Sequence, residues 1–190
     1  MTFNISAVVA CPLARRHSGA AQPGGWPFSI LKEEQLLEFS QDPSLQLVDT
    51  RIKDALARND FCVGAIMDGN LIAYAWRSFS ATPHDKENNI WVDFRTDCGY
   101  GHHSLTLPAY RGQHIMSSLY AFADNCCLDK GKTYAIGYVD TDNYPAIRAT
   151  LRAGYRIVGY AGYLLLFGRF FSFSTPGSKK YGFRFFRRQH

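Results

Sequence analysis

The sequence lacks any cysteine pattern typical of a disulfide framework or a zinc site. Its five cysteines are odd in number, and none of them forms a C-x-x-C pair. It also lacks an apolar run of about 20 residues, the length that a bilayer-spanning helix requires. The N-terminus has no basic segment ahead of a long apolar core, as a secretory signal would have. These absences predict a cytoplasmic protein with no transmembrane segment and no bound metal.

Acidic residues are absent from the last part of the chain. Between Ala161 and His190 there is no Asp or Glu, whereas Lys and Arg occur six times, which exceeds the net charge of +5 for the whole chain. Residues 175–190 are therefore predicted to form a basic, aromatic C-terminal tail. Such a tail is either a solvated surface or a contact for an anionic partner, such as a phosphate group, an acidic substrate, a membrane surface or RNA. Nucleic acid is the least favoured, because no known RNA-binding motif is present.

The composition that remains is typical of one folded domain. Hydrophobic residues make up 46% and charged residues 19% of the 190 residues, as in globular proteins, and a chain of this length can bury a single core. We expect one domain over residues 1–190. Gly, Ala, Gln and Pro dominate residues 18–26, so loose order is expected within residues 1–28.

The N-terminal half shows helical periodicity first and strand periodicity later. Apolar residues fit a short helix over residues 30–39 and a second helix that Asp42 and Pro43 open. Residues 61–67 and 71–76 form the clearest hairpin, because the Asp-Gly-Asn turn between them accepts positive φ. A polar, exposed loop over residues 80–89 and a strand over residues 90–95 are expected to follow.

The segment 102–159 carries the functional prediction. Residues 104–107 alternate as in a strand, and Pro108 ends the strand because proline has no N–H for the ladder. A helix follows from Ile115, then a second strand, and then a short helix that closes on Gly154. This β-α-β-α order suits an anionic ligand.

The turn from Arg111 to His114 lies at the N-terminus of the first of these helices. Free backbone N–H groups and the positive end of the helix dipole favour phosphate oxygens at such a place. Arg111 can add a charge-assisted hydrogen bond. The turn is therefore a predicted pyrophosphate site.

These residues carry a resemblance to a known family. The stretch LTLPAYRGQHIMSSL, followed by GYVDTDNYPAIRATLRAGYRIVG, resembles the acetyl-CoA-binding half of the GCN5-related N-acetyltransferase (GNAT) superfamily. The phosphate turn of that family, Arg/Gln-x-x-Gly-x-Gly/Ala, falls on Arg111 to Met116, with His114 and Met116 at the two later glycine positions. A second family feature, Asn-x-x-Ala followed by Gly-Phe, is matched by Asn143, Ala146, Gly154 and Tyr155.

The resemblance implies an α/β (α+β) fold with a central, mixed, mostly antiparallel twisted sheet of six to seven strands, flanked by about four helices. It also implies that acetyl-CoA, or another acyl-CoA, binds as co-substrate along the second half of the chain. The cofactor-binding residues so implied are Leu105, Thr106, Leu107, Arg111, Gly112, Gln113, His114, Ile115, Met116 and Asn143. The side chains of His114 and Met116 are expected to restrict positive φ and the approach of a phosphate.

Two adjacent histidines are the candidate catalytic bases, on the resemblance and on an unperturbed pKa near 6.5. Side chains alternate along a strand, so we expect only one to face the substrate, with His102 preferred and His103 on the opposite face. Many family members have a tyrosine that protonates the CoA thiolate where this chain has Thr150, a poor acid. Asp142 or Asn143 is suited to cap the next helix, and for Asp142 a cap is preferred over a second role, with Asp140, in binding a cationic amine.

The resemblance predicts an acyl-CoA-dependent N-acyltransferase that moves an acetyl group to a primary amine by direct attack in a ternary complex. Two alternatives stay open. One is a non-catalytic acyl-CoA-binding or regulatory module, and the other is a transferase of a longer acyl or aminoacyl group. The sequence does not decide between a small-molecule amine and a protein amine as acceptor, and it leaves a homodimer open.

Overall fold

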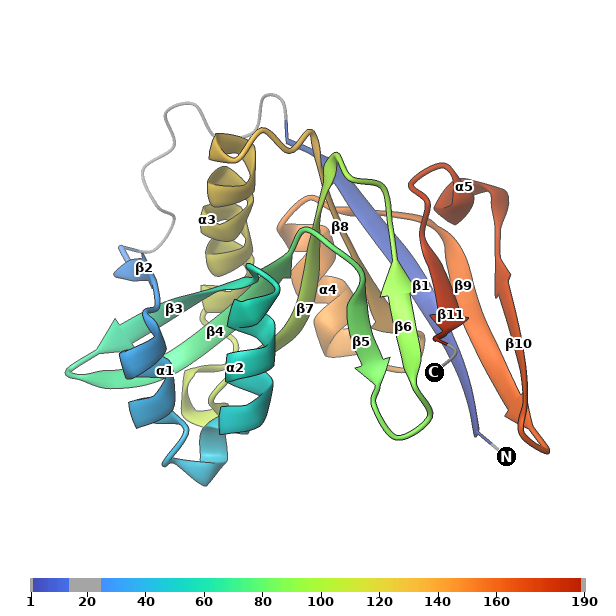
Figure 1. The fold of residues 1–190 in the computed structure, drawn as a ribbon. Helices are drawn as coiled ribbons and strands as arrows, with labels where there is room; N and C mark the ends of the chain where they lie inside the picture. The colour runs from blue at the N-terminus through green and yellow to red at the C-terminus, as the bar shows by residue number, and fades with distance from the viewer. Residues whose placement is uncertain (1, 14–24, 189–190) are drawn as a thin grey trace.

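A computed structural model describes residues 2–13 and 25–188 of the chain. Its centre is an eight-stranded sheet in the order β10-β9-β1-β8-β7-β4-β3-β2, in which only β7 and β8 are parallel neighbours (Figure 1). The strands are β1 (Thr2–Pro12), β2 (Phe28–Ile30), β3 (Phe61–Met67), β4 (Asn70–Ser78), β7 (Cys98–Thr106), β8 (Tyr134–Asp140), β9 (Arg156–Leu166) and β10 (Arg169–Ser174). This is the predicted α/β fold with a mixed, mostly antiparallel sheet.

A second, three-stranded sheet has the order β11-β6-β5. Its strands are β5 (Thr82–Asp85), β6 (Ile90–Asp93) and β11 (Arg184–Arg187). The helices are α1 (Glu33–Phe39), α2 (Asp49–Ala57), α3 (Ile115–Asp129), α4 (Tyr144–Arg152) and α5 (Pro176–Lys179), with 3-10 turns at Pro43–Leu45 and Pro108–Tyr110. The described residues thus hold more strands than the six to seven expected.

Three hydrophobic clusters join these layers. On one face of the main sheet, α3 packs against β3, β4 and β7 through buried residues such as Leu119 and Ala123. On the other face, α1 and α2 cover β3 and β4 through Leu36 and Ile52. The small sheet covers β1, β8 and β9 on that second face, and Phe183 is fully buried in the contact. The two covering units leave the middle of this face to the site described below.

Local sequence signals account for several of these elements. The hairpin of β3 and β4 forms as predicted, with Asp68 and Gly69 at φ of 49° and 81° in its turn. The helix predicted from Ile115 is α3, and Gly131 follows its end at a φ of 75°. Asp42 caps a 3-10 turn rather than the second helix, which begins later as α2.

The expectation of loose order in residues 1–28 is wrong for the part that the structure describes. β1 is an 11-residue strand that pairs with β8 on one side and β9 on the other. Val8 and Cys11 are fully buried, on opposite faces of the sheet. A strand covered on both faces reads as a continuous apolar run, without the alternation that marks a half-buried strand. The predicted loop at residues 18–26 lies largely outside the described residues.

The prediction of a C-terminal tail over residues 175–190 is also corrected by the structure. Residues 175–190 contain α5 and β11, and β11 pairs with β6. Phe183 and Phe185 are buried between the two sheets, while Arg184 points outward. These two aromatic side chains therefore pack in the core, and Arg184 lies at the surface. The expected exposed loop at residues 80–89 likewise contains a strand, β5.

None of the helices in the described ranges has both the length and the apolar character that crossing a bilayer requires.

Candidate active site between two diverging strands

The parallel strands β7 and β8 part in the middle of the sheet. They pair from Cys98 opposite Tyr134 to Gly101 opposite Gly137, and no pairing between them continues beyond that point in the described residues. Farther along, and within the described part of the chain, β7 pairs only with β4 and β8 only with β1. The backbone groups of β7 from residue 102 onward are therefore left without a strand partner on the β8 side. Such an edge can pair with an extended ligand.

Glycine is required where the two strands part. A Cβ at Gly101 would lie 2.8 Å from Nη1 of Arg77. Arg77 is 2% exposed and is held by Asp124, whose Oδ1 lies 3.1 Å from Nη2. The guanidinium therefore could not move aside without breaking a buried ion pair.

A β-bulge places both candidate histidines on one face of the sheet. In the pairing of β4 with β7, Ala75 lies opposite Ser104 and Trp76 opposite His102, so His103 is the extra residue, with a φ of 42°. The ring of His102 stacks on Trp76 at 6.3 Å, and the ring of His103 lies 6.0 Å from Tyr74. The expectation that His103 points to the opposite face is therefore wrong, because a bulge breaks the strict alternation of a strand.

Three cavities follow one another through this part of the molecule. The first, of about 360 Å³, lies between α2 and β5. The second, of about 80 Å³, lies where β7 and β8 part, and shares His102, His103 and Tyr138 with the first. The third, of about 420 Å³, lies between the N-terminal end of α3 and α4, and shares Ser104 and Tyr120 with the second. The opening between the strands thus joins the two faces of the sheet.

Most of the predicted cofactor residues line the third cavity, which we call the α3–α4 groove. They are Leu105, Thr106, Arg111, Gly112, His114, Ile115, Met116 and Asn143. Leu107 instead packs against the core under α1 and α2, and Gln113 does not line the groove. Sequence reasoning missed Arg148 and Arg152 of α4, which face the groove. No acidic side chain is among the described residues that line it, so its charge is positive.

The turn before α3 has the conformation of a phosphate-binding turn. Gly112 and His114 adopt φ of 81° and 60°. Among the described residues, the N–H groups from Gly112 to Ser117 find no acceptor, as expected for a helix N-terminus. Arg111 is exposed, with its Nε donating to the Thr106 carbonyl at 3.1 Å. His114 was expected to restrict positive φ, yet it adopts it, at a strain of roughly 1 kcal/mol.

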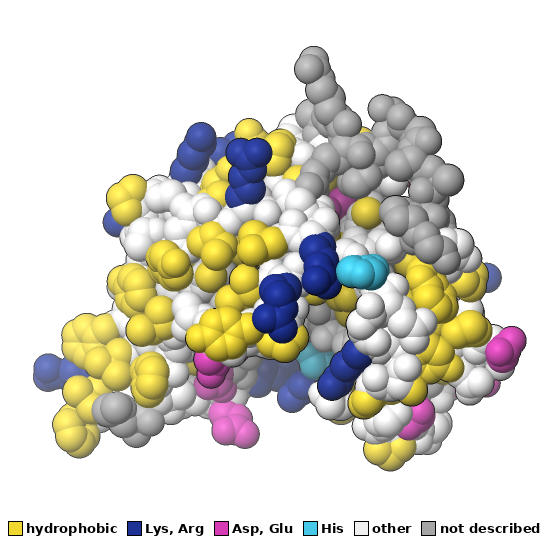
Figure 2. Space-filling model, turned by 180° about the vertical axis from the view of Figure 1, so that it is seen from behind, with side chains coloured by type: hydrophobic (Ala, Val, Ile, Leu, Met, Phe, Trp, Pro, Cys, Tyr) yellow, Lys and Arg dark blue, Asp and Glu magenta, His cyan; other side chains and the backbone are white. Residues whose placement is uncertain are grey.

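Basic side chains are also visible on this face as a group. Figure 2 shows Lys and Arg gathered near its middle, beside a histidine and without an acidic side chain between them. This distribution agrees with the lining of the α3–α4 groove. An anionic ligand would be attracted to it.

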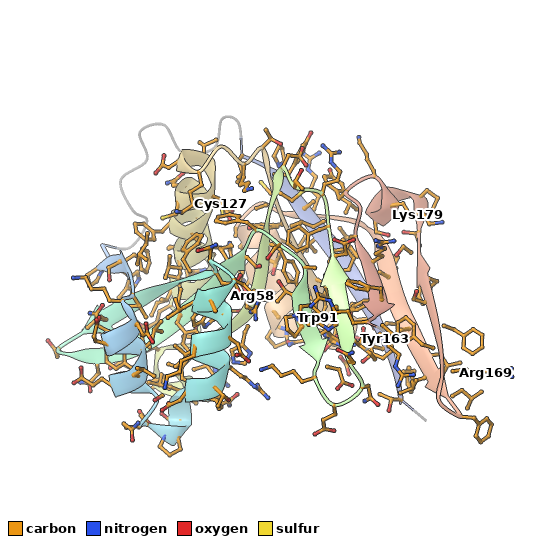
Figure 3. All side chains as sticks on the ribbon, in the orientation of Figure 1. Arg58, Trp91, Cys127, Tyr163, Arg169 and Lys179 are labelled. Carbon is orange, nitrogen blue, oxygen red and sulfur yellow. The ribbon has the colours of Figure 1, made fainter. Side chains whose placement is uncertain are left out.

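On the other face, His102 meets a buried carboxylate that sequence reasoning missed. Nε2 of His102 lies 3.6 Å from Oδ2 of Asp60, whose side chain is fully buried. Arg58, which follows α2 and is labelled in Figure 3, holds the same oxygen, with its Nη2 at 2.7 Å. Within the described residues, Nε2 of His102 and Oδ1 of Asp60 are both buried and have no hydrogen-bond partner. Nδ1 of His102 does not belong to this group of buried, unpaired atoms. Nδ1 is thus the ring nitrogen left for the cavity. No sequence pattern links Asp60 to His102.

Burial keeps His102 in the neutral form. It lowers the pKa of His102 below the ordinary value, and the Asp60 carboxylate opposes this change only in part. Burial raises the pKa of Asp60, but the contacts with His102 and Ser78 and the charge of Arg58 outweigh it, so that the net pKa is lowered. A neutral imidazole beside an ionised carboxylate can accept a proton.

The residues predicted around the next helix take other roles. The hydroxyl of Thr150 is buried and donates to the Ala146 carbonyl at 2.8 Å. Asn143, not Asp142, caps α4, since its Oδ1 accepts from the N–H of Ala146. Asp140 accepts hydrogen bonds from residues of β1. None of these three contacts places a free proton donor in the opening.

Tyr120 contributes a hydroxyl group to the opening. Its OH group is 2.8 Å from Oγ of Ser104, and both residues line the second cavity and the α3–α4 groove. The guanidinium of Arg77 lies 5.2 Å from the centre of its ring. Cys98, in contrast, is buried, and burial raises the pKa of its thiol to about 12, which excludes it as a nucleophile at neutral pH.

Comparisons with known proteins agree with this geometry. The family model described as the acetyltransferase (GNAT) family matches residues 28–155. No curated protein sequence matches the chain. The match covers the chain from β2 to the end of α4 and thus includes the opening and the α3–α4 groove.

Solved structures resemble the chain in fold. A GNAT-family acetyltransferase from Novosphingobium aromaticivorans aligns with a TM-score of 0.57 and 16% identity, over 84% of this chain and 63% of that one. A GNAT-family acetyltransferase from Colwellia psychrerythraea gives 0.57 and 17%, over 92% and 57%. The aminoglycoside N-acetyltransferase AAC(6')-Iy in complex with CoA gives 0.55 and 15%, over 68% and 91%. The chain therefore spans less than two thirds of the first two proteins.

Proposed function

The chain belongs to the acetyltransferase (GNAT) family, and on that premise we propose that it transfers an acetyl group from acetyl-CoA to a primary amine by direct attack in a ternary complex. The observation that carries the proposal is the opening between β7 and β8. It joins a cationic groove on one face of the sheet to a cavity lined by histidines on the other. We take residues 1–190 to be one domain that performs this reaction.

The α3–α4 groove is the proposed place of acetyl-CoA. The free N–H groups of the turn before α3 would bind the pyrophosphate, with Arg111 beside them. Arg148 and Arg152 would face the remaining phosphate charge. The unpaired edge of β7 would bind the amide groups of the pantetheine arm as an added strand does. The thioester would then lie at the opening.

The cavity between α2 and β5 is the proposed place of the acceptor. Its volume of about 360 Å³ is at the lower end of the range of small-molecule sites. Its lining carries charges of both signs. An ion pair joins the β5–β6 turn to α2, because Nζ of Lys86 lies 2.6 Å from Oδ2 of Asp54. Because neither sign prevails, the acceptor is proposed only as an amine, either of a small molecule or of a protein.

His102 is the proposed general base. Its Nδ1 takes a proton from the acceptor ammonium, so that the neutral nitrogen can attack the thioester carbonyl. Asp60 stabilises the imidazolium that forms, and the rings of Trp76 and Tyr100 hold the imidazole in place. The carbon–nitrogen bond forms, and the carbon–sulfur bond then breaks.

Tyr120 is the proposed general acid in place of the tyrosine that this chain lacks at position 150. It comes from α3 rather than from α4, yet it reaches the junction of the α3–α4 groove and the opening. Its O–H would protonate the leaving thiolate, and Ser104, which shares a hydrogen bond with it, would hold the hydroxyl in position. CoA would then leave as the neutral thiol, and the phenolate of Tyr120 would take up the second proton that the attacking nitrogen loses as the amide forms.

Isothermal titration with acetyl-CoA tests the proposal before any acceptor is known. We expect micromolar binding by the wild type and a loss of at least tenfold in Arg111→Ala, because a charge-assisted contact to phosphate contributes about 1.5–3 kcal/mol. Arg51→Ala is the matched control, since Arg51 is an exposed arginine that lines the other cavity. Its affinity for acetyl-CoA should equal that of the wild type.

Three outcomes of the titration bear on the proposal. No binding of acetyl-CoA to the wild type would count against the proposed reaction and would direct the search to longer acyl-CoA molecules. An equal loss in Arg51→Ala would show that general charge, not the turn before α3, decides affinity. Binding lost only in Arg111→Ala would justify a screen of amines with His102→Gln as the inactive control.

The second candidate function is an acyl-CoA-binding module that performs no reaction. The observation in its favour is the hydroxyl of Thr150, which is engaged with its own helix and cannot act as an acid. Turnover of any amine at enzyme-like rates would exclude this candidate. A transferase of larger acyl groups held by a free basic tail loses support, because residues 176–187 belong to α5, β11 and the segment between them.

A further inference from the structure

One face of the main sheet is left bare over the start of β1 and over β9 and β10. The register of these strands places Phe3 opposite Leu164, and Leu164 opposite Phe171. One pair further along, Gly162 lies between Ile5 and Phe173. Figure 2 shows hydrophobic side chains spread over the half of this face that contains β9 and β10.

The side chains on this face are exposed to an unusual degree. The exposed fractions are 65% for Phe3, 48% for Ile5, 42% for Ile157, 44% for Tyr160, 54% for Phe171 and 46% for Phe173. We call these six residues the β9–β10 patch. Phe171 and Phe173 also lie on β10, the edge strand of the sheet, which natural proteins normally protect with charges or a covering element.

The size of the β9–β10 patch matches what a stable protein contact requires. An aromatic side chain offers about 150–250 Å², so the exposed fractions of the six side chains correspond to roughly 500 Å² of apolar surface. A standard interface buries about 800 Å² per partner, somewhat more than half of it apolar. The β9–β10 patch with its rim would therefore supply one side of such an interface.

We propose that this face binds the same face of a second copy of the chain, so that the protein is a homodimer about a two-fold axis. The positions that share the face on β1, β9 and β10 are apolar except Arg169. Arg169 is the first residue of β10 and lies next to the turn that joins β9 to β10 (Figure 3). A two-fold axis through the β9–β10 patch places the two Arg169 side chains at opposite ends, and no like charges meet.

The charge of the face decides between occupants. An acidic peptide or an anionic membrane surface would call for several cations within the contact. The face offers only Arg169 among the described positions that share it. An apolar and nearly neutral surface is complementary to a copy of itself.

The dimer contact is separate from the proposed active site. β9 and β1 stand between β10 and the opening at β8, and no residue of the β9–β10 patch lines the three cavities of the site. A variant that separates the two copies should therefore bind acetyl-CoA as the wild type does. This distinguishes failure of the dimer from failure of the proposed function.

Sedimentation equilibrium over a wide series of protein concentrations tests the proposal. We expect a dimer for the wild type and a monomer for Phe171→Glu, because a carboxylate in the contact would lose its hydration against an apolar surface. Phe167→Glu is the matched control: Phe167 lies in the turn of the same hairpin, off both strands, and is 95% exposed. It should stay a dimer.

Phe3→Glu provides a second variant from another strand, and circular dichroism checks that each variant is folded. A wild type that is monomeric at every concentration would overturn the proposal. So would a dimer that survives both Phe171→Glu and Phe3→Glu. Loss of the dimer in Phe167→Glu to the same extent would move the contact to the hairpin tip and would equally overturn it.

Discussion

The substitution Asp60→Asn tests the electrostatic basis of the proposed catalysis most directly. It replaces the carboxylate near Nε2 of His102 by a neutral amide of nearly the same shape. Burial already lowers the pKa of His102, and Asp60 opposes that change. Removing the negative charge leaves burial unopposed, so the pKa of His102 should fall further.

The size of the fall follows from the contact. Oppositely charged groups within about 4–6 Å shift a pKa by roughly 1–3 units, and the two side chains approach to 3.6 Å with Asp60 fully buried. We therefore expect the acidic limb of the pH–rate profile to move to lower pH by about 1–3 units. A weaker base also slows proton transfer, so the plateau rate should fall by roughly tenfold.

The pKa can be measured without knowing the acceptor. NMR titration of the imidazole ring protons gives the pKa of His102, and His102→Gln identifies its signal. Asp54→Asn is the matched control, because Asp54 lines the same cavity but is paired with Lys86. A pKa of His102 that is unchanged or raised in Asp60→Asn would refute the reasoning, as would an equal fall in Asp54→Asn.

Two further predictions concern backbone positions of the site. Gly101→Ala should lower the free energy of unfolding by about 1–3 kcal/mol, because the added Cβ would meet the buried Arg77 guanidinium at 2.8 Å; urea unfolding measures this, and wild-type stability would contradict the close approach. His114→Gly should be about 1 kcal/mol more stable than His114→Ala, because position 114 has a φ of 60°; equal melting temperatures would contradict the strain.

The cofactor half of the site could be read from the sequence because its signals are local. The turn before α3 and the cap at Asn143 depend on residues within a few positions of each other, and the structure places most of the predicted residues along one groove. The sequence did not predict Arg148 and Arg152 as groove residues, because the elements that a helix face packs against are known only from the tertiary structure.

The catalytic half depends on contacts between distant parts of the chain. Asp60 precedes β3 and meets His102 of β7 only because β3, β4 and β7 are neighbours in the sheet. Tyr120 reaches the opening because α3 packs across β7. No spacing in the sequence indicates either contact.

The sequence by itself determined the α/β order of elements, the hairpin of β3 and β4, and the turn that opens α3, because these rest on short-range backbone preferences and apolar periodicity. Only the tertiary structure decided which strand lies beside β8, where β7 and β8 part, and which way His103 points. Strand pairing and a bulge are settled by partners far along the chain, since the hydrogen bonds and the burial that fix them exist only after the sheet has assembled.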